Sequence, residues 1–383
     1  MIRAFKYRMY PTPKQLAVME HQFGLCRWLH NCALEHRISS FKAGKPVSYK
    51  DQANELPSFK ESFPDFKTVH SQILQDVLKR LDKSFQHFFR RVKQGDTPGY
   101  PRFKGKERFH SISYPQSGFS VTGSRIYLSG MGKVRVRVHR DITRAMQIKT
   151  CTIKKSGDHW YGILSVELQS VPVPKKVVTN PVGIDLGLST FATISNGEII
   201  DNPRYLRHSE KKLALIQAAY ALRKTKAFKR KMTTLHQKIA NQRYDFLHKE
   251  STKLVNRFDL IAFEDLSIKN MAQRCKPVQT EGGGFASNGQ TAKSGLNKSI
   301  YDAGWGKFIA MLIYKAESAG SYAIAVNPYN TSQICSGCGT IVKKTLKKRQ
   351  HECPVCGRSV DRDLNASYNI LRLGTDRVKE GFA

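Results

Sequence analysis

Acidic residues are scarce in this sequence. Its 383 residues include 30 Asp and Glu against 64 Lys and Arg, which gives a formal net charge of +34 at pH 7. Such a surface attracts polyanions, and nucleic acid is the usual one. A basic coat that serves only solubility is the alternative, but a surface of balanced charges would serve that purpose as well. The charge therefore favours a protein that binds nucleic acid.

Long hydrophobic runs and a disulfide framework are also missing. No window approaches the roughly 18 apolar residues of a membrane span, and the first residues, MIRAFKYRMYPTP, lack the apolar core of a signal peptide. Four cysteines are scattered and four form two pairs at metal spacing, which is typical of a reducing compartment. We expect a cytoplasmic protein, associated with the nucleoid through DNA, that makes no membrane contact. A hydrophobic content of 40% excludes wholesale disorder.

The first half of the chain combines helices with short strands. Residues 2–10 alternate as a strand, and the spacing of apolar residues predicts helices over residues 14–38 and 71–92. Short alternating segments between residues 110 and 170, separated by Gly, Ser and Asp, predict a small β-domain. It could be an open barrel that the first strand completes, with the helices as an insertion. Residues 171–181, VPVPKKVVTNP, predict a linker.

The second half begins with strands around VGIDLG. Residues 205–258 lack Gly and Pro, which predicts two long helices broken near RKTKAFKRK. Residues 260–266 predict a short buried strand, and the Gly-rich residues 273–298 predict a mobile loop. A helix over about residues 302–318 and a strand over residues 322–328 are expected before the last cysteines.

Two CxxC pairs form the most specific local motif. Each pair can direct two thiolates to one point, and four thiolates favour a closed, tetrahedral, structural zinc site. A redox pair is the alternative, but two matched pairs on a hairpin argue against it. Between them, KKTLKKR at residues 343–349 can contact phosphate. The four cysteines are Cys335, Cys338, Cys353 and Cys356.

Acidic residues occur where a charge is costly. Asp185 lies within the apolar stretch VGIDLG, Glu264 ends the apolar stretch LIAFE, and Asp361 and Asp363 begin the last predicted helix. A capped or salt-bridged acid is the ordinary explanation for any one of them. Together they can converge at one sheet edge, where their repulsion calls for Mg²⁺ or Mn²⁺. Two such ions about 4 Å apart clamp a phosphodiester for cleavage.

The order of these motifs resembles a known family. GIDLG, FEDLSIKNM, DAGWG, the CxxC pairs and DRDLNAS follow one another as in the TnpB proteins of insertion sequences, which are relatives of the type V CRISPR effectors. The N-terminal YRMYPTPKQ, FFRRVK and GYPRFKGK also fit, so the resemblance covers nearly the whole chain. Ser367 departs from the family pattern, which has Ala there, and we expect only a minor packing effect. The chain also ends soon after Leu373, without the longer tail of some members.

The resemblance implies an α+β multidomain fold. A wedge β-barrel is expected over residues 1–10 and 106–172, with an inserted helical recognition domain over residues 11–105. An RNase H-like (RuvC) α/β nuclease domain is expected over residues 180–383, with a zinc ribbon inserted at residues 329–360.

The resemblance also implies an activity, RNA-guided and metal-dependent cleavage of DNA. It places the catalytic acids and Mg²⁺ (or Mn²⁺) ligands at Asp185, Glu264 and Asp363, with Asp265 on the other face of its strand. The implied partners are a guide RNA from the transposon end and double-stranded DNA with a short flanking motif, bound by a monomer. Candidate nucleic-acid contacts are Tyr49, Gln72, Gln75, Tyr100, Arg102, Phe103 and Lys104.

The first turn of the last helix distinguishes two aspartates. Asp361 stands where an N-cap belongs, and Asp363 can face the other acids. Asn365 is expected on the opposite side, toward DNA or solvent. Two rival functions use the same residues, namely RNA-guided binding without cleavage and DNA strand transfer by a 3′-hydroxyl.

Overall fold

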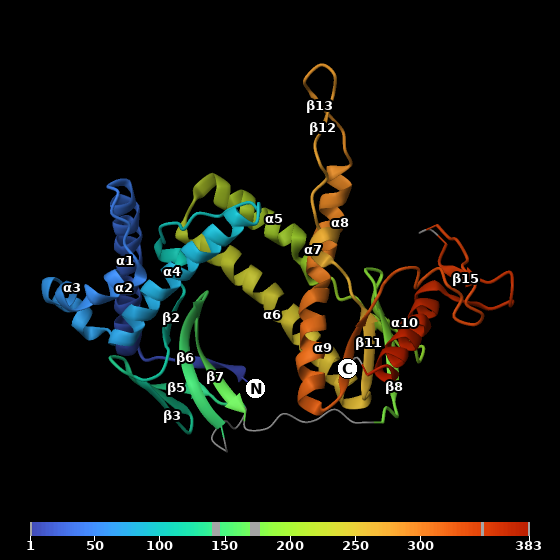
Figure 1. Ribbon diagram of the computed structural model, residues 1–383, viewed down its shortest axis with the longest axis horizontal. Coiled ribbons are helices and arrows are strands. Elements are labelled where there is room, and N and C mark those ends of the chain that lie inside the picture. Colours follow the sequence, from blue (N-terminus) through green and yellow to red (C-terminus); the bar gives the residue numbers. More distant parts are fainter. Residues whose placement is uncertain (1, 140–145, 169–176, 346–347, 382–383) are drawn as a thin grey trace. The chain divides into compact units, whose positions relative to one another are not determined.

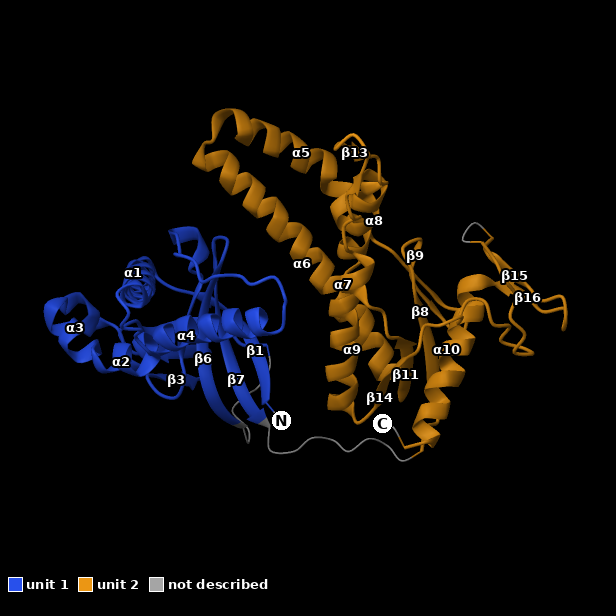
Figure 2. Cartoon of the chain, turned by 45° about the horizontal axis from the view of Figure 1, so that its top comes forward, with its two compact units in different colours: residues 1–170 blue, residues 171–383 orange. Residues whose placement is uncertain are grey.

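The computed structural model describes residues 2–139, 146–168, 177–345 and 348–381. The chain forms two compact units, residues 1–170 and residues 171–383 (Figure 2). The linker expected at residues 171–181 lies partly outside the described residues. Within the described residues, every helix is too short or too polar to span a bilayer.

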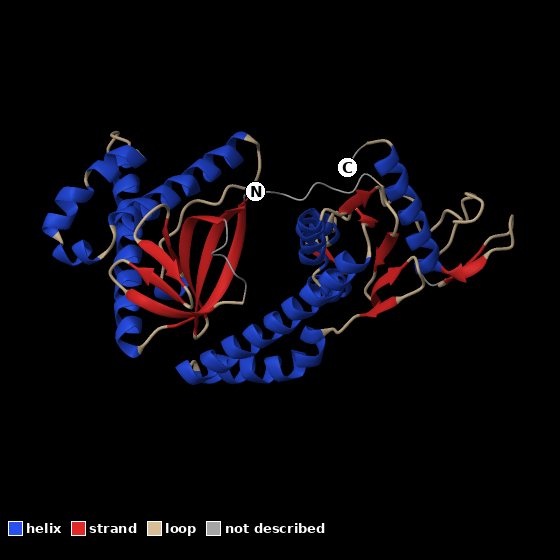
Figure 3. Ribbon diagram, turned by 90° about the horizontal axis from the view of Figure 1, so that it is seen from below, coloured by secondary structure: helices blue, strands red, loops and turns tan. Residues whose placement is uncertain are grey.

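Unit 1 is built on a seven-stranded antiparallel sheet (Figure 3). The strand order is β2-β6-β7-β1-β5-β4-β3, so the strand expected at residues 2–10 lies inside the sheet between β7 and β5. Its alternation buries Phe5, Tyr7 and Met9 on one face. The strands are β1 (Ile2–Tyr10), β2 (Ser111–Tyr114), β3 (Phe119–Thr122), β4 (Arg125–Leu128), β5 (Gly132–Arg137), β6 (Met146–Ser156) and β7 (His159–Leu168).

The helices of unit 1 lie between β1 and β2 in the chain. They are α1 (Pro13–Lys42), α2 (Tyr49–Asn54), α3 (Leu56–Ser62), the 3₁₀ turn η1 (Pro64–Thr68) and α4 (Ser71–Lys93), with a further turn, η2 (Lys106–Arg108), before β2. A capping box between Thr12 and Gln15 starts α1. The apolar faces of α1 and α4 join the sheet in one continuous core, as their spacing predicted.

Unit 2 contains a five-stranded mixed sheet of order β10-β9-β8-β11-β14. The three strands β8, β11 and β14 are parallel, and β9 and β10 add to β8 as an antiparallel meander. The strands are β8 (Pro181–Leu186), β9 (Thr190–Ile194), β10 (Ile199–Asp201), β11 (Leu260–Glu264) and β14 (Tyr322–Val326).

Helices cover both faces of this sheet (Figure 1). Ile184, Ile261 and Phe263 pack on one face with side chains of α6 (Lys226–Arg257) and α9 (Trp305–Ala319). Ala262 and Leu260 pack on the other face with α10 (Arg362–Lys379). The two faces alternate along each strand, so every second residue of β8 and β11 points to α10.

Two further elements extend unit 2. The helices α5 (Tyr205–Arg223) and α6 run side by side, and the break between them at Lys224 and Thr225 falls where the sequence predicted it (Figures 1 and 2). After β11 come the short helix α7 (Ile268–Met271) and a two-stranded hairpin of β12 (Val278–Gln279) and β13 (Phe285–Ala286), followed by α8 (Gln290–Ala303).

The expectation of a mobile loop over residues 273–298 is therefore wrong. A hairpin and the first part of α8 occupy it. The composition concealed the helix, because Gly, Ser and Asn interrupt QTAKSGLNK and are frequent in the residues before it. A glycine in the left-handed region stands at each end of α8. Gly289 precedes the helix with φ 70°, and Gly304 follows it with φ 74° and separates it from α9.

Two glycines let α10 lie directly on the sheet. A Cβ on Gly183 of β8 would stand 2.1 Å from the carbonyl oxygen of Ser367 in α10. A Cβ on Gly374 of α10 would stand 2.4 Å from the Cβ of Ala262 in β11. Both contacts involve backbone or the first side-chain atom, which cannot move aside. The separation of helix and sheet therefore depends on the absence of these side chains.

We predict that Gly183→Ala lowers the free energy of unfolding by about 3 kcal/mol, because the added methyl group must push α10 away from the sheet. Gly282→Ala is the control, since a Cβ at Gly282 meets no atom within 4 Å; it should change the stability by less than about 0.5 kcal/mol. Chemical denaturation of both variants gives the comparison. Equal stability of the two variants would contradict the close approach.

Candidate functional site

Two of the predicted acids lie side by side on the face of the sheet that α10 covers. Parallel β8 and β11 pair Ile184 with Phe263, so Asp185 and Glu264 are the next pair along. Side chains at the same level of adjacent parallel strands point to the same face. Gly183 and Ala262, two residues earlier, both contact α10. Asp185 and Glu264 therefore point to the side of α10.

Asp363 approaches this pair from the first turn of α10. The carboxylate of Asp361 caps the helix, accepting from the backbone N–H of Asp363 at 2.8 Å and of Leu364 at 3.2 Å, which confirms its predicted role. Asp363 lies one turn before Ser367, the residue that contacts Gly183, so it shares the face of α10 that is turned to β8. Its negative charge acts on Asp185.

Burial and neighbouring negative charges destabilise the charged form of Asp185. Burial, with the negative charges of Glu264 and Asp363, raises the pKa of Asp185 to about 8. Burial also raises the pKa of Glu264, although the hydroxyl of Thr331 donates to Glu264 Oε1 at 2.5 Å and opposes this rise. A carboxyl group with a pKa raised as far as that of Asp185 retains a proton near neutral pH unless a cation replaces it. Carboxylate oxygen atoms are the ligands that a divalent cation such as Mg²⁺ takes.

Arginine side chains compensate the third carboxylate. Arg349 Nη1 donates to Asp363 Oδ2 at 3.3 Å, and Arg362 Nη2 donates to Asp363 Oδ1 at 3.1 Å. The sequence reasoning missed both arginines and Thr331. Arg362 lies within the DRD motif and could have been suspected. Arg349 and Thr331 are distant in sequence from their partners, so no local pattern indicated them.

Asp265 lies just beyond β11, where the expected alternation of faces no longer applies, and it shares a cavity with Leu373 and Arg377 of α10. It is exposed, and Asn327 lines the same cavity. It is also absent from the charges that raise the pKa of Asp185.

We predict that the protein in a metal chelator loses stability as the pH rises from about 4 to about 8 because of Asp185. In this range the folded state holds a proton that the unfolded chain releases, so a higher pH favours unfolding. The high net charge acts in the opposite direction, and Asp185→Asn separates the two effects. The variant should gain stability relative to the original protein as the pH rises, measured by thermal unfolding at a series of pH values. A constant difference between the two proteins would refute the raised pKa.

The four predicted zinc ligands converge. Their sulfur atoms all lie within 4.8 Å of one another, including 3.6 Å between Cys335 and Cys356 and 3.5 Å between Cys338 and Cys353. These distances suit a tetrahedral zinc ion, whose bonds to sulfur measure about 2.3 Å. The hydroxyl and backbone N–H of Thr340 lower the pKa of Cys338 to about 6, which favours the thiolate that binds metal.

The cysteine cluster is attached to α10. Asn365 Oδ1 accepts from the backbone N–H of Ser336 at 3.0 Å, and its Nδ2 donates to the carbonyl of Ile334 at 2.8 Å. Asn369 Nδ2 donates to the carbonyl of Thr331 at 2.9 Å. Both asparagines are buried, so the expectation that Asn365 faces DNA or solvent is wrong. The cysteine segment lies between β14 and α10, closed by the hairpin of β15 (Gln350–Glu352) and β16 (Ser359–Asp361).

We predict that each chain binds one zinc ion. The substitution Cys353→Ser should abolish zinc binding and unfold the hairpin of β15 and β16. Because Asn365 connects this segment to α10, the variant should also unfold at a lower temperature. Elemental analysis and thermal unfolding measure the two effects. Cys275→Ser is the matched control, since Cys275 is half-buried outside the cluster and should keep the metal. A zinc content that Cys353→Ser leaves unchanged would contradict the assignment.

The candidate contacts of α4 and α2 differ in exposure. Gln72 Oε1 accepts from the backbone N–H and the hydroxyl of Ser117, at 3.0 Å and 3.1 Å. Its amide is thus engaged within unit 1, which reduces its suitability for reading bases. Gln75 is exposed, and Tyr49, at the first position of α2, packs partly against the core.

The segment after α4 presents rings and cations together. Tyr100 is 47% exposed and packs edge-to-face on Phe88, and Phe103 is 50% exposed. Arg102 is exposed, whereas the backbone of Lys104 exchanges two hydrogen bonds with the side chain of Asn31. Exposed aromatic and basic side chains of this kind suit base stacking and phosphate contact.

Three family descriptions match the chain. They are "Helix-turn-helix domain" over residues 1–46, "Probable transposase" over residues 164–274 and "Cas12f1-like, TNB domain" over residues 305–370. The third covers the cysteine cluster and Asp363. The described residues of the first contain one strand and one long helix, β1 and α1, so its name does not describe the fold found there.

Named relatives extend over nearly the whole chain. The chain is 33% identical to "Putative RNA-guided DNA endonuclease InsQ" of Escherichia coli (strain K12), over 97% of this chain and 92% of that protein. It is 31% identical to "Putative RNA-guided DNA endonuclease" of Streptomyces pristinaespiralis, over 97% and 89%. It is 25% identical to "CRISPR-associated endodeoxyribonuclease Cas12f1" of Sulfoacidibacillus thermotolerans, over 99% of both chains.

Buried acids on a mixed sheet, a cysteine cluster hydrogen-bonded to the adjoining helix and a strongly basic composition agree with the endonuclease class that the names of the relatives give. The chain belongs to the TnpB family of IS605-type insertion sequences.

Proposed function

We propose that this protein is an RNA-guided DNA endonuclease that uses divalent metal and cuts a target beside a short flanking motif. The observation that carries the proposal is the placement of Asp185 and Glu264 at neighbouring positions of β8 and β11, where burial and the negative charges of Glu264 and Asp363 raise the pKa of Asp185 to about 8. The names of the relatives, over more than nine-tenths of this chain, support guided cleavage. A basic surface with +34 net charge supplies the attraction for RNA and DNA.

The acid site has a defined part in this reaction. Asp185, Glu264 and Asp363 would hold Mg²⁺ or Mn²⁺, which supplies activation of water and stabilisation of the leaving oxygen. The chain's own residues hold the site in shape. Thr331 fixes Glu264, Asp361 fixes the first turn of α10, and Arg349 and Arg362 compensate Asp363 until the metal arrives.

The proposed domains are distributed over the two units. We assign residues 1–10 and 106–172 to a wedge domain and residues 11–105 to a helical recognition domain. In unit 2 we assign residues 180–383 to a RuvC-like, RNase H-like nuclease domain with a zinc ribbon at residues 329–360. The sheet order β10-β9-β8-β11-β14 with α10 across its acidic face supports the nuclease assignment. Guide pairing supplies sequence specificity, and the protein supplies backbone contacts and reads the flanking motif.

In the cell, the protein would bind as a monomer to a guide RNA from the transposon end and act on DNA in the cytoplasm. Gln75 is better placed than Gln72 to contact the flanking motif, because Ser117 engages Gln72. Exposed Tyr100, Arg102 and Phe103 suit the RNA.

We predict that Asp363→Asn abolishes cleavage by the protein–guide complex and leaves target binding intact, because it removes a metal ligand and no basic surface. Asp361→Asn is the matched control two residues away. Asn caps helices as well as Asp does, so α10 and cleavage should persist.

Both variants and the original protein are incubated with guide RNA, matched DNA and Mg²⁺, beside a binding assay. Cut ends from the original protein support the endonuclease, whereas a bound but intact duplex supports a guided binder and joined products support strand transfer. Cleavage by Asp363→Asn, with none by Asp361→Asn, would reverse the two roles.

A further inference from the structure

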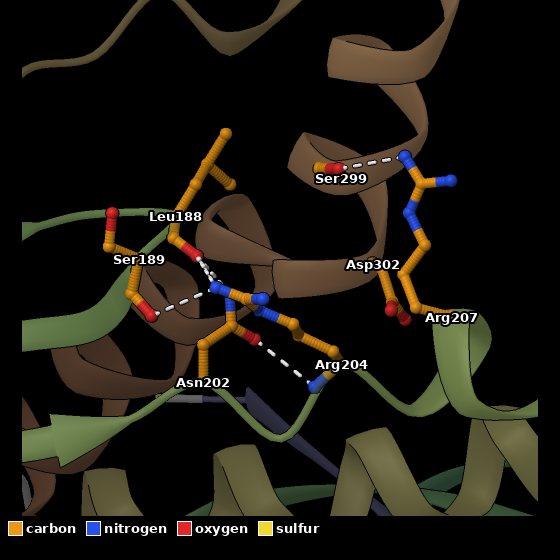
Figure 4. A pocket seen from close by; sticks show the side chains of 7 residues that line it. All are labelled: Leu188, Ser189, Asn202, Arg204, Arg207, Ser299 and Asp302. Carbon is orange, nitrogen blue, oxygen red and sulfur yellow. Dashed lines mark hydrogen bonds between the residues drawn. The ribbon is translucent and has the colours of Figure 1, made fainter.

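A cavity of about 470 Å³ opens in unit 2 between the turn that follows β8 and the start of α5 (Figure 4). The turn between β8 and β9 forms one wall with Leu188 and Ser189. The residues at the start of α5 form another with Arg204 and Arg207, and Ser299 of α8 completes it. Six of the seven lining residues carry a polar or charged side chain, two of them guanidinium groups, so the cavity can hold a charged ligand.

The charge of the cavity is positive. Its only acidic lining residue among those described, Asp302, is neutralised by Arg243 at 2.7 Å and accepts from the backbone N–H of Leu206 at 3.0 Å. Arg207 bonds to Ser299 Oγ at 3.1 Å and forms an exposed ion pair with Glu210, which Lys298 shares at 2.8 Å. The remaining cationic group, the guanidinium of Arg204, is directed at the turn before β9.

The backbone of Arg204 holds a conformation that is unusual for arginine. Its φ and ψ are both 44°, in the left-handed region. Asn202 supports this conformation, because its Oδ1 accepts from the backbone N–H of Arg204 at 3.2 Å and its Nδ2 donates to the carbonyl of Leu188 at 3.0 Å. The guanidinium then reaches the carbonyls of Leu188 and Ser189 through two long bonds of 3.3 Å. A strained basic residue that lines a cavity and makes only long bonds to its wall is typical of a binding group.

One guanidinium connects the cavity to the acids. Arg349 Nη2 bonds to Ser189 Oγ at 3.0 Å, and Nη1 of the same group bonds to Asp363 Oδ2 at 3.3 Å. The wall of the cavity and the acid site are therefore separated by one planar side-chain group. A strand held at the acid site would therefore have neighbouring phosphates within reach of the cavity wall.

We propose that this cavity binds the sugar–phosphate unit of a nucleotide next to the scissile phosphate, with Arg204 as the group that holds its phosphate. The inference rests on the proposed endonuclease function and adds a second binding site for the cleaved strand. Guanidinium, hydroxyl and amide groups are those that bind phosphate and sugar, and such contacts position a strand without reading its sequence. The described lining contains no aromatic ring, so the base is not stacked there.

The test combines an altered protein with an altered DNA. After the cut position is mapped in matched DNA, a single uncharged methylphosphonate replaces each linkage in turn within three nucleotides on either side. Arg204→Asn removes the guanidinium and keeps the backbone, because Asn tolerates the left-handed region. Lys212→Gln, an exposed position on α5 outside the cavity, removes one positive charge as the control.

We expect one modified linkage to slow cutting by the original protein by about tenfold. Arg204→Asn should slow cutting of natural DNA to a similar extent, with unchanged target binding, and show no further loss at that linkage. Lys212→Gln should behave as the original protein does on both substrates.

The same experiment distinguishes two failures. Natural DNA that the original protein leaves uncut overturns the endonuclease function and, with it, this inference. The inference alone is overturned if natural DNA is cut but every modified linkage slows Arg204→Asn as much as it slows the original protein. The inference is also overturned if the modified linkage causes no further loss of cleavage in Lys212→Gln either. The loss of any positive charge would then explain the effect.

Discussion

The contact of α10 with the sheet of unit 2 is the constraint on which the rest of the site depends. Gly183 and Gly374 leave no room for a side chain between helix and strands, so the helix has one depth and one register. That register brings the charge of Asp363 to act on Asp185, which lies beside Glu264 because of the alignment of β8 and β11. On its opposite side the same helix holds the cysteine segment through Asn365 and Asn369. One helix thus positions the acids and the metal-binding hairpin together.

Much of this arrangement could be predicted from local patterns. The alternation of apolar residues predicted β1. Apolar runs that contain an acid predicted the strands that carry Asp185 and Glu264. The residues before α10 predicted Asp361 as its N-cap. In each case the signal lies within a few residues. The acids stood out because a charge within an apolar strand is costly without a compensating group.

The rest could not be predicted, because it depends on partners distant in the chain. Arg349 meets Ser189, 160 positions away, and Thr331 meets Glu264, 67 positions away. Asn365 was assigned to the outer face of its helix, since nothing local indicates that the cysteine segment returns to cover it. Residues 290–298 were assigned to a loop, because glycine, serine and asparagine conceal a helix whose stability comes from its neighbours.

The compensation of Asp363 by two arginines has a consequence for how the two kinds of metal enter the protein. Since Arg349 and Arg362 already balance this carboxylate, and Asp185 can keep a proton, the acid site folds around internal substitutes for its metal. The four sulfur atoms lie on two short turns, and a cluster of this kind is held together by the metal itself. The zinc proposed there would be acquired during folding. The two sites would therefore respond differently to a shortage of metal, because the cysteine segment would lose its fold and the acid site would lose only its metal.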